Sequence, residues 1–340
     1  MTKSDTSIEA VTGENALRDT SGARIIHLDC TLRGVAQSGR ALRSGHSAAD
    51  GVADAAGELE PGQTLLVEGL PNEAYHRLPV PSKSPLWDFR RHGPVWYSQR
   101  YVSRTREPFS SSALQLGSVV HAALEHGPGE YRDHLTVIPA EYLTASGGLS
   151  AGKEAKAWLA DQSPDSTLAS PADLAICEAI LEQFFANPAA RELYEQVWKH
   201  ELSAIHRRED GRLIRCRFDA VTELGMVLDW KTTRDVRPLE TWWKTVVEHG
   251  YAEQQVLYTD IAHAAGIGHG GMIFVVMSTT PPHQVQVVRL PDAMIRARRD
   301  WVAEVLDEIE ARHETGNWMP ENYGEITELR VPEWAMRGEA

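Results

Sequence analysis

The chain has 340 residues and a formal net charge of −14, from 34 lysines and arginines against 48 aspartates and glutamates. No stretch approaches the roughly 18 continuous apolar residues of a membrane span, and the N-terminal stretch lacks the apolar core of a secretory signal, so we expect neither a membrane protein nor a secreted one. Three widely separated cysteines (Cys30, Cys177 and Cys216) predict neither a disulfide framework nor a zinc site, which favours a cytoplasmic protein with reduced thiols.

The amino-acid composition and the apolar periodicity of the chain change near residue 65. Residues 1–65 are rich in Ala, Gly, Ser and Asp with weak apolar periodicity, which predicts a largely flexible leader with one short strand at residues 24–28. From Tyr75 onward, proline turns alternate with aromatic residues, which is typical of short helices packed on a core. Residues 113–125 have apolar side chains at helical spacing and predict a helix, and residues 146–152 predict a loop.

The middle of the chain changes from helical to strand periodicity. Residues 172–196 predict one helix or two, with a break near Asn187-Pro188. The run GRLIRCRFDAV then alternates with period two, and MVLDWKT follows it after a turn at residues 223–225. With the preceding run HELSAIHRR, these segments predict a three-stranded antiparallel meander.

The C-terminal third predicts further helices and strands. A helical region is expected over residues 239–265, interrupted near Gly250, and the runs GGMIFVVMS and HQVQVVRL predict two more strands. Residues 291–316 predict a long amphipathic helix. The pattern indicates one α/β (α+β) domain over residues 66–340, with a central mixed sheet flanked by helices.

Arginines cluster in two places, which bears on whether an acidic protein could bind nucleic acid. The first cluster lies between Arg90 and Arg106, and the second between Arg207 and Arg217. Phosphate backbones are bound mainly by Lys and Arg, so the net charge argues against such a partner, but a local basic groove can coexist with an acidic exterior. The alternative is that each cluster is an ordinary solvated face.

The two strands of the predicted hairpin carry a set of charged residues suited to metal chemistry. Asp229 and Lys231 are two apart on one strand and share a face, and a turn-linked partner strand can bring Asp219 beside them. Two carboxylates with the main-chain carbonyl of Trp230 could hold Mg²⁺, for which Mn²⁺ would substitute, and Lys231 could position a water or stabilise developing negative charge. The sequence therefore predicts a phosphodiester hydrolase centred on these residues.

The alternative for this set is a structural ion pair on a strand surface, which would contribute little. The pattern of an acid two residues before a lysine is common, and Glu154 and Lys156 also satisfy it. Apolar neighbours on both sides of Asp229 make an uncommitted charge costly there, which favours a site.

The run CRFDAVTELGMVLDWKTT resembles the catalytic core of the RecE-type exodeoxyribonuclease VIII family, a lambda-exonuclease-like branch of the PD-(D/E)xK nuclease superfamily. The segments LQLGSVVHAALEH and YAEQQVLYTDI match that family in the right order, and YHRLPVPSKSPLWDF and VPEWA echo the ends of its domain. The resemblance covers about residues 75–334 and implies a restriction-endonuclease-like core.

The resemblance implies roles for four further residues. It places a metal ligand at His121, a pair that positions DNA or the catalytic lysine at Gln254 and Tyr258, and an extra acidic catalytic member at Glu201. The alternatives are a core histidine at His121 and an ordinary packed tyrosine at Tyr258. Trp242 and Trp243 could stack on bases, although core burial is the simpler interpretation.

The resemblance also implies an activity and partners. The expected reaction is processive 5′-to-3′ digestion of linear double-stranded DNA from its ends, by a ring-like homo-oligomer that exposes 3′ tails for a single-strand annealing protein. Two alternatives stay open: a nuclease of the same fold that acts on single strands or as an endonuclease, and a DNA-binding module that kept the fold without catalysis.

Overall fold

The computed structural model describes residues 7–10, 23–29, 47–107, 112–145, 147–162, 166–234, 236, 238–328 and 331. The chain forms two compact units: a larger unit of residues 1–83 and 109–302, and a smaller unit of residues 84–108 and 303–340. We expected one domain over residues 66–340. The structure divides this region because aromatic side chains of residues 84–108 pack with the C-terminal segment.

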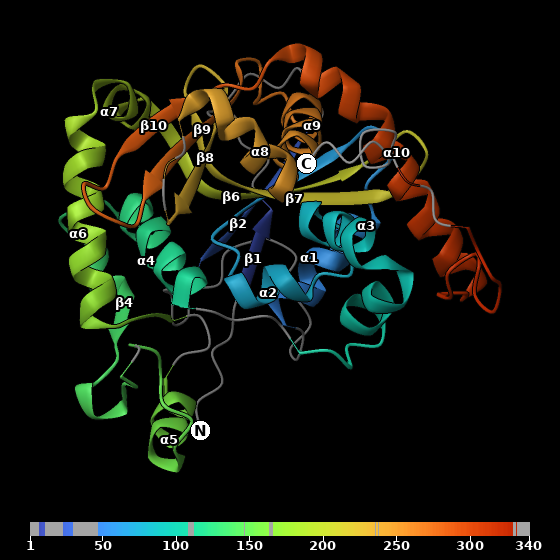
Figure 1. The fold of residues 1–340 in the computed structure, drawn as a ribbon. Helices are drawn as coiled ribbons and strands as arrows, with labels where there is room; N and C mark the ends of the chain where they lie inside the picture. Colours follow the sequence, from blue (N-terminus) through green and yellow to red (C-terminus); the bar gives the residue numbers. More distant parts are fainter. Residues whose placement is uncertain are drawn as a thin grey trace. The chain divides into compact units, whose positions relative to one another are not determined.

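The larger unit contains the sheets and most of the helices (Figure 1). Its described strands are β1 (Ser7–Ala10), β2 (Arg24–Asp29), β3 (Thr64–Glu68), β4 (Leu135–Val137), β5 (Thr167–Ala169), β6 (Val197–Arg207), β7 (Leu213–Thr222), β8 (Met226–Thr233), β9 (Gly271–Ser278) and β10 (Val285–Val288). Its described helices are α1 (Ala48–Gly57), α2 (Asn72–Arg77), α4 (Ser112–His126), η2 (Tyr131–His134), η3 (Ala140–Tyr142), α5 (Lys153–Ala160), α6 (Pro171–Ala186), α7 (Pro188–Glu195), α8 (Leu239–His249) and α9 (Tyr251–Ala264).

Eight strands form one mixed sheet in the order β1-β2-β3-β6-β7-β8-β9-β10, and β4 pairs with β5 in a separate small sheet. The β2–β3 and β8–β9 pairs are parallel, and the other pairs of the large sheet are antiparallel. Strands β6, β7 and β8 form the meander expected from the sequence. Because β8 and β9 are parallel, the chain must cross over between them, and α8 and α9 make that connection.

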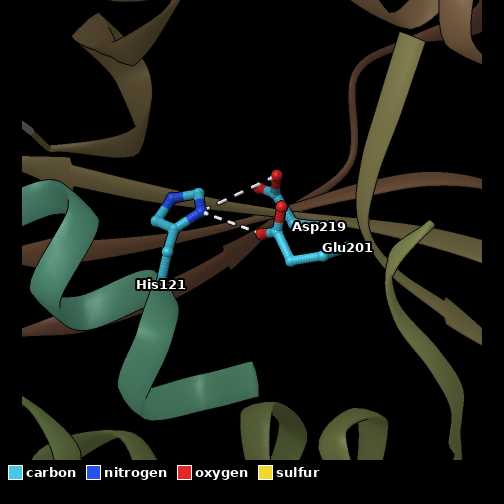
Figure 2. A group of neighbouring side chains, drawn as sticks. All are labelled: His121, Glu201 and Asp219. Atoms are coloured by element: carbon cyan, nitrogen blue, oxygen red, sulfur yellow. Dashed lines mark ion pairs between the residues drawn. The ribbon is translucent and has the colours of Figure 1, made fainter. Parts of the chain in front are cut away.

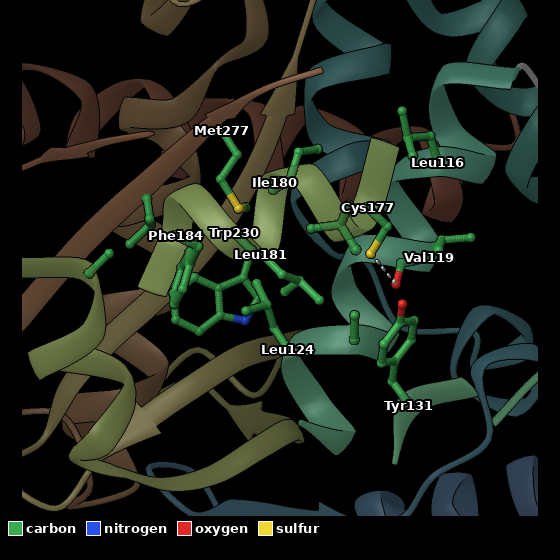
Figure 3. Packing of buried hydrophobic residues seen from close by; sticks show 14 of the residues in the cluster. Leu116, Val119, Leu124, Tyr131, Cys177, Ile180, Leu181, Phe184, Trp230 and Met277 are labelled. Carbon is green, nitrogen blue, oxygen red and sulfur yellow. Dashed lines mark hydrogen bonds between the residues drawn. The ribbon is translucent and has the colours of Figure 1, made fainter. Parts of the chain in front are cut away.

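Different helices cover the two faces of the sheet. Strand alternation sends Phe274 to one face and Met277 to the other. Phe274 stacks on Tyr251, the first residue of α9, with ring centroids 5.4 Å apart. On the opposite face, Met277 and Trp230 join residues of α4 and α6 in the main core, where Phe184 meets Trp230 edge to face (Figure 3).

Local capping explains where several helices begin and end. Ser170 and Asp173 form a reciprocal capping box at the start of α6, and Asn187 caps α7 ahead of Pro188. Gly250 adopts a left-handed φ of 64° between α8 and α9. These features confirm the helix breaks predicted near Asn187 and Gly250.

Residues 47–65 are part of the larger unit, although we expected residues 1–65 to form a flexible leader. Ser47 caps α1 through a capping box with Asp50, and Val52 and Ala56 of α1 are fully buried. The following strand, β3, is paired on both sides, with β2 and with β6. The helix is short and its buried residues are small (Ala49, Gly51, Val52 and Ala56), and a segment rich in Ala, Gly, Ser and Asp resembles a flexible one in composition. The strand expected at residues 24–28 is confirmed as β2, whereas most other residues before Ser47 lie outside the described part of the chain.

The smaller unit consists of helical segments and contains an aromatic cluster. Most of α3 (Lys83–Tyr97), the π-helix η1 (Ser98–Val102) and the C-terminal half of α10 (Asp292–Thr315) belong to it. Tyr97 stacks on Trp318 with ring centroids 5.3 Å apart and meets Phe89 edge to face at 5.4 Å. None of the helices that the structure describes is long and apolar enough to cross a membrane.

Candidate active site

The β7–β8 hairpin opens at the position where the predicted catalytic residues lie. The registered pairing of the two strands ends at Ala220↔Leu228. One residue further along, Asp219 Oδ2 accepts a hydrogen bond of 2.7 Å from the main-chain N–H of Trp230. The carboxylate of Asp219 is therefore held at the opening by the backbone of the neighbouring strand.

Glu201 contributes a second carboxylate from strand β6. The register of β6 with β7 places Glu201 opposite Asp219. Glu201 has a φ of 46°, in the left-handed region that a non-glycine residue reaches only at a cost of roughly 1–2 kcal/mol. Such backbone strain inside a strand is typical of functional sites, where surrounding contacts hold the residue in place.

His121 of α4 faces these two carboxylates (Figure 2). Its Nδ1 lies 3.7 Å from Glu201 Oε1 and 3.8 Å from Asp219 Oδ1, while its Nε2 lies 3.0 Å from the carbonyl oxygen of Trp230. One turn earlier on α4, Gly117 lets the helix approach β8 closely, because a Cβ there would come within 3.3 Å of Thr232 Oγ1.

The donor set of this cluster fits a divalent cation. One ligand atom from each of His121, Glu201 and Asp219 lies within 4.8 Å of the others, and among the described residues no second group of this kind occurs. Two carboxylates are hard ligands suited to Mg²⁺ or Mn²⁺, and an imidazole nitrogen binds Mn²⁺ more readily than Mg²⁺. The carbonyl of Trp230, expected to be a ligand, lies beside the same histidine.

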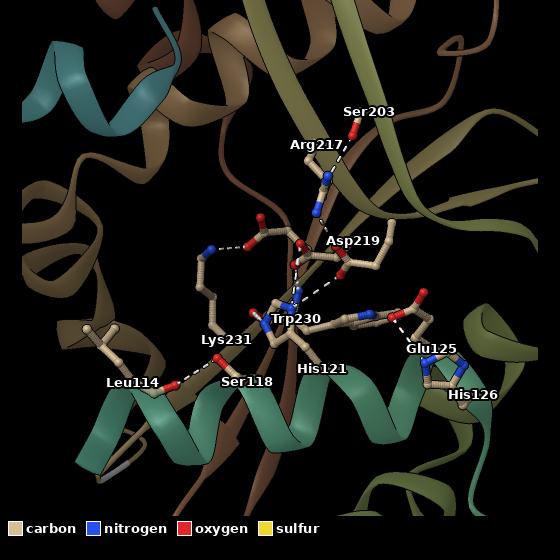
Figure 4. A network of polar contacts seen from close by, with 12 residues as sticks. Leu114, Ser118, His121, Glu125, His126, Ser203, Arg217, Asp219, Trp230 and Lys231 are labelled. Atoms are coloured by element: carbon tan, nitrogen blue, oxygen red, sulfur yellow. Dashed lines mark hydrogen bonds and ion pairs between the residues drawn. The ribbon is translucent and has the colours of Figure 1, made fainter. Parts of the chain in front are cut away.

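Asp229 and Lys231 form a buried ion pair. Figure 4 shows Lys231 beside His121, Asp219 and Trp230. Asp229 is 1% exposed, and its Oδ2 lies 2.5 Å from Lys231 Nζ. Its Oδ1 accepts a hydrogen bond from the side-chain amide of Gln254, which is itself buried in α9. The two oxygens of Asp229 are thus both engaged by neighbouring side chains, whereas those of Glu201 and Asp219 converge on His121.

The surroundings of Lys231 keep its ammonium group charged. Burial alone would lower the pKa of Lys231, but the carboxylates of Asp229 and Asp219 outweigh burial and raise it above its ordinary value. The ring of Tyr251 lies under the ammonium, with its centroid 5.2 Å from Nζ. A lysine held in this state acts as a cation rather than as a base.

In the absence of a metal ion, His121 and Asp219 both bind protons more tightly than usual, and a bound cation would displace these protons. Burial raises the pKa of Asp219 to about 7, with Asp229 and Glu201 adding to the shift and His121 and Lys231 opposing it. Burial would lower the pKa of His121, but Asp219 and Glu201 outweigh it and raise it to about 9. Metal ligation requires a deprotonated imidazole and carboxylate, so cation binding and proton release are coupled.

We expect the metal-free protein to lose stability between pH 6.5 and about pH 9 because of His121. A histidine whose pKa is raised on folding stabilises the fold fully below its unfolded pKa, and this contribution, up to about 3 kcal/mol, disappears as the pH rises through the folded pKa. Urea denaturation in EDTA across this range measures the decline. His121→Gln should flatten it and the exposed-site control His263→Gln should not; an unchanged decline in His121→Gln would contradict the assignment.

Arg217 is a site residue that the sequence analysis placed only in a basic cluster. Its Nη1 lies 3.9 Å from Glu201 Oε2, its Nε donates to Ser203 Oγ at 2.9 Å, and its Nη2 donates to the carbonyl of Leu70 at 2.7 Å. Its guanidinium also lies over the ring of Tyr75, 4.4 Å from the centroid. These contacts place a fixed positive charge beside the strained glutamate.

Glu125 is a second neighbour of the cluster without an assigned role in the sequence. It lies one turn after His121 on α4, and burial together with the charge of Glu201 raises its pKa to about 7. Helical spacing could have indicated Glu125 from the sequence. Residues i and i+4 of a helix share a face, so Glu125 lies on the same face of α4 as His121.

The predicted residues fall into two adjacent groups and one outlying position. His121, Glu201 and Asp219 form the cluster, and Asp229, Lys231 and Gln254 form the buried pair with its amide partner. Tyr258 lies edge to face with Phe218 at 5.7 Å, and burial raises its pKa well above its ordinary value. Its hydroxyl therefore stays protonated.

The two predicted tryptophans differ in burial. Trp242 is 3% exposed and belongs to the interior, whereas Trp243 is 55% exposed.

Comparisons with known proteins agree with this fold. A family model described as a PDDEXK-like domain of unknown function (DUF3799) matches residues 97–331. A crystal structure from Eubacterium rectale, titled as that of a candidate exonuclease, is similar with a TM-score of 0.50 and 15% identity, over 79% of this chain and 96% of the other. The comparison with curated proteins found no matching sequence.

Proposed function

This chain belongs to the PDDEXK-like domain family DUF3799, and we propose that it is a divalent-metal-dependent nuclease that hydrolyses phosphodiester bonds of DNA. The fold is that of the PD-(D/E)xK nuclease superfamily. The observation that carries the proposal is the convergence of His121, Glu201 and Asp219 beside the buried Asp229–Lys231 pair. A binding module without chemistry has no physical need for this arrangement, because its buried charges are costly.

Each residue has a distinct role in this proposal. Glu201, Asp219 and His121 would hold the cation, and the carbonyl of Trp230, a further proposed ligand, contacts Nε2 of His121. When bound, a divalent cation supplies Lewis acidity toward water and phosphate oxygens.

Lys231 would place its ammonium against the negative charge that develops on the phosphate in the transition state. Asp229 and Gln254 would fix the position of Lys231, since they hold one another in a buried contact. Asp229 stays among the proposed catalytic residues and metal ligands because its carboxylate lies buried beside the cluster and contacts Lys231 directly.

The finer assignment is an end-dependent exonuclease of the exodeoxyribonuclease VIII type. Its support is the order and spacing of the motifs around His121, the Asp219–Lys231 region and Gln254–Tyr258, together with the similarity in fold to the candidate exonuclease from Eubacterium rectale. On this assignment the enzyme digests linear duplex DNA from the 5′ end as a ring-like homo-oligomer. The 3′ tails that it leaves would be bound by a single-strand annealing protein, and the cation would be Mg²⁺ or Mn²⁺.

Digestion of linear 5′-phosphorylated duplex DNA with Mg²⁺, beside a covalently closed circle of the same sequence, tests this proposal. We expect loss of the linear duplex alone, with mononucleotides released first from the 5′-labelled end. Cleavage of the circle would contradict the exonuclease assignment, and no cleavage of either DNA with Mg²⁺ or Mn²⁺ by folded protein would contradict the nuclease itself.

A further inference from the structure

We propose that residues 84–107 of the smaller unit, here called the arginine arm, form a DNA-binding element that contacts the phosphate backbone. The inference rests on the proposed nuclease function and goes beyond it by assigning a substrate-binding surface outside the catalytic cluster. The arm comprises α3 after Lys83, the π-helix η1 and the short segment that follows it.

The charge of the arm is opposite to that of the chain. Its acidic residues are Asp88 and Glu107, and it contains no lysine. Its five arginines are Arg90, Arg91, Arg100, Arg104 and Arg106, in a chain with 34 basic and 48 acidic residues. A positive segment in an acidic protein is what a polyanionic ligand would recognise.

Four of the five arginines of the arm have no carboxylate partner among the described residues. Within the part of the chain that the structure describes, Arg90, Arg91, Arg100 and Arg106 form no ion pair with an acidic side chain. The carboxylate of Asp88, the other acidic residue of the arm besides Glu107, accepts a hydrogen bond of 2.5 Å from Tyr101.

Exposed arginines elsewhere in the chain mostly do form ion pairs. The pairs include Arg77–Glu73, Arg132–Glu178, Arg191–Glu195, Arg289–Asp292, Arg298–Glu253 and Arg299–Asp260. An ordinary solvated face would look like these regions, with each arginine beside a carboxylate. The arm differs from them, because the charges of Arg90, Arg91, Arg100 and Arg106 are not paired with carboxylates of the described residues and can meet a ligand.

The backbone of the arm is irregular at several consecutive points. Gly93 interrupts α3 with a φ of 82° ahead of Pro94, η1 follows as a π-helix, and Arg104 has a left-handed φ of 53°. A non-glycine residue in that region is strained, and π-helical segments occur often at functional sites. These irregularities bend the arm so that it does not form one straight helix.

An aromatic stack lies within the same segment. His92 and Trp96 stack with ring centroids 4.5 Å apart, and the Arg106 guanidinium lies over Trp96 at 5.4 Å from its centroid. Arg106 also donates to the side-chain oxygen of Gln99 at 3.0 Å. The stack orients one guanidinium before any ligand arrives, and pre-organised arginines bind phosphate oxygens well because their planar donors match the phosphate geometry.

The test is DNA binding by the full chain in EDTA, where no cleavage occurs. Anisotropy of a short labelled duplex is measured over a range of salt concentrations for wild type, Arg90→Gln/Arg91→Gln, and a control pair of equal charge change, Arg191→Gln/Arg289→Gln. We expect the arm variant to bind about ten-fold or more weakly, with a slope of log affinity against log salt shallower by about 2, and the control to match wild type.

Two further measurements separate this inference from misfolding and from the proposed function. Arg90→Lys/Arg91→Lys keeps the charge and should restore most of the affinity; binding as weak as that of the glutamine pair would overturn the inference. Hydrolysis of bis(p-nitrophenyl) phosphate with Mn²⁺, a substrate too small to need the arm, should be equal in wild type and arm variant.

The outcomes distinguish the two claims. Equal DNA affinity and salt slope in wild type and arm variant, with hydrolysis of the small substrate intact, would overturn the arm and leave the nuclease standing. Arm-dependent DNA binding by a wild type that hydrolyses neither DNA nor the small substrate would support the arm and overturn the nuclease.

Discussion

Replacing Lys231 with methionine is expected to lower the rate of DNA hydrolysis by about a hundred- to a thousand-fold, the usual loss when one pre-positioned charge-stabilising group is removed. The ammonium is held by Asp229 and by the face of Tyr251, and its raised pKa keeps it charged throughout the working pH range. Single-turnover rates with saturating Mn²⁺ measure the effect, because they report the chemical step rather than product release.

The same substitution is expected to destabilise the protein by about 3–5 kcal/mol, since it leaves the buried carboxylate of Asp229 without its cation. The double variant Asp229→Leu/Lys231→Met, which removes both charges, should recover most of this stability in urea denaturation while remaining inactive. Full activity in Lys231→Met, or a double variant less stable than the single one, would contradict the roles given to this pair.

Replacing Asp219 with asparagine is expected to make the metal-free protein more stable at pH 8 while abolishing both cation binding and hydrolysis. Burial raises the pKa of this carboxyl to about 7 in the folded chain, against about 3.9 for an unperturbed aspartate. An acid whose pKa is raised on folding costs stability progressively as the pH rises from the unfolded to the folded value, here up to about 4 kcal/mol at pH 8. Asparagine removes that cost, and its carbonyl can still accept the hydrogen bond from Trp230 N. It also removes one of the two carboxylates that stabilise protonated His121, so the net gain is smaller than about 4 kcal/mol.

Thermal unfolding with and without Mn²⁺ at pH 8 and at pH 4 tests this expectation. Asp219→Asn should unfold at a higher temperature than wild type in EDTA at pH 8, show no further rise with Mn²⁺, and lose its advantage at pH 4. The exposed control Asp260→Asn, which only disturbs the surface pair with Arg299, should behave as wild type in its response to Mn²⁺. A metal-induced rise in Asp219→Asn equal to that of wild type would show that the cation binds elsewhere.

Much of the larger unit could be predicted from sequence because its elements carry strong local signals. The alternating run around Phe218 predicted β7, the turn before Met226 predicted the hairpin, and the capping residues at Asn187 and Gly250 marked the helix breaks. The clustering of Asp219 with His121 followed from the resemblance of the motifs, since the two residues lie far apart in the chain. The periodicity of apolar residues indicates whether a residue lies in a helix or a strand, but not which distant residues it contacts.

Other features could not be predicted because they depend on tertiary contacts. The parallel pairing of β8 with β9 requires a crossover that no local pattern encodes. Strand β3 joins the sheet from a segment whose helix α1 is short and buries only small side chains. The left-handed φ of Glu201 and the three contacts that hold Arg217 beside it also arise only in the folded state. The structure therefore places Arg217 beside the candidate site and gathers Glu201 with His121 and Asp219, whereas Asp229 contacts Lys231 and Gln254.

If His121, Glu201 and Asp219 form a divalent-metal site, anomalous scattering from a wild-type crystal soaked with Mn²⁺ should locate the ion among them. We expect a strong peak in coordination contact with all three side chains, absent from Asp219→Asn crystals grown in the same way. A well-ordered wild-type crystal with Mn²⁺ bound elsewhere, or with no Mn²⁺ at this cluster, would contradict the claim.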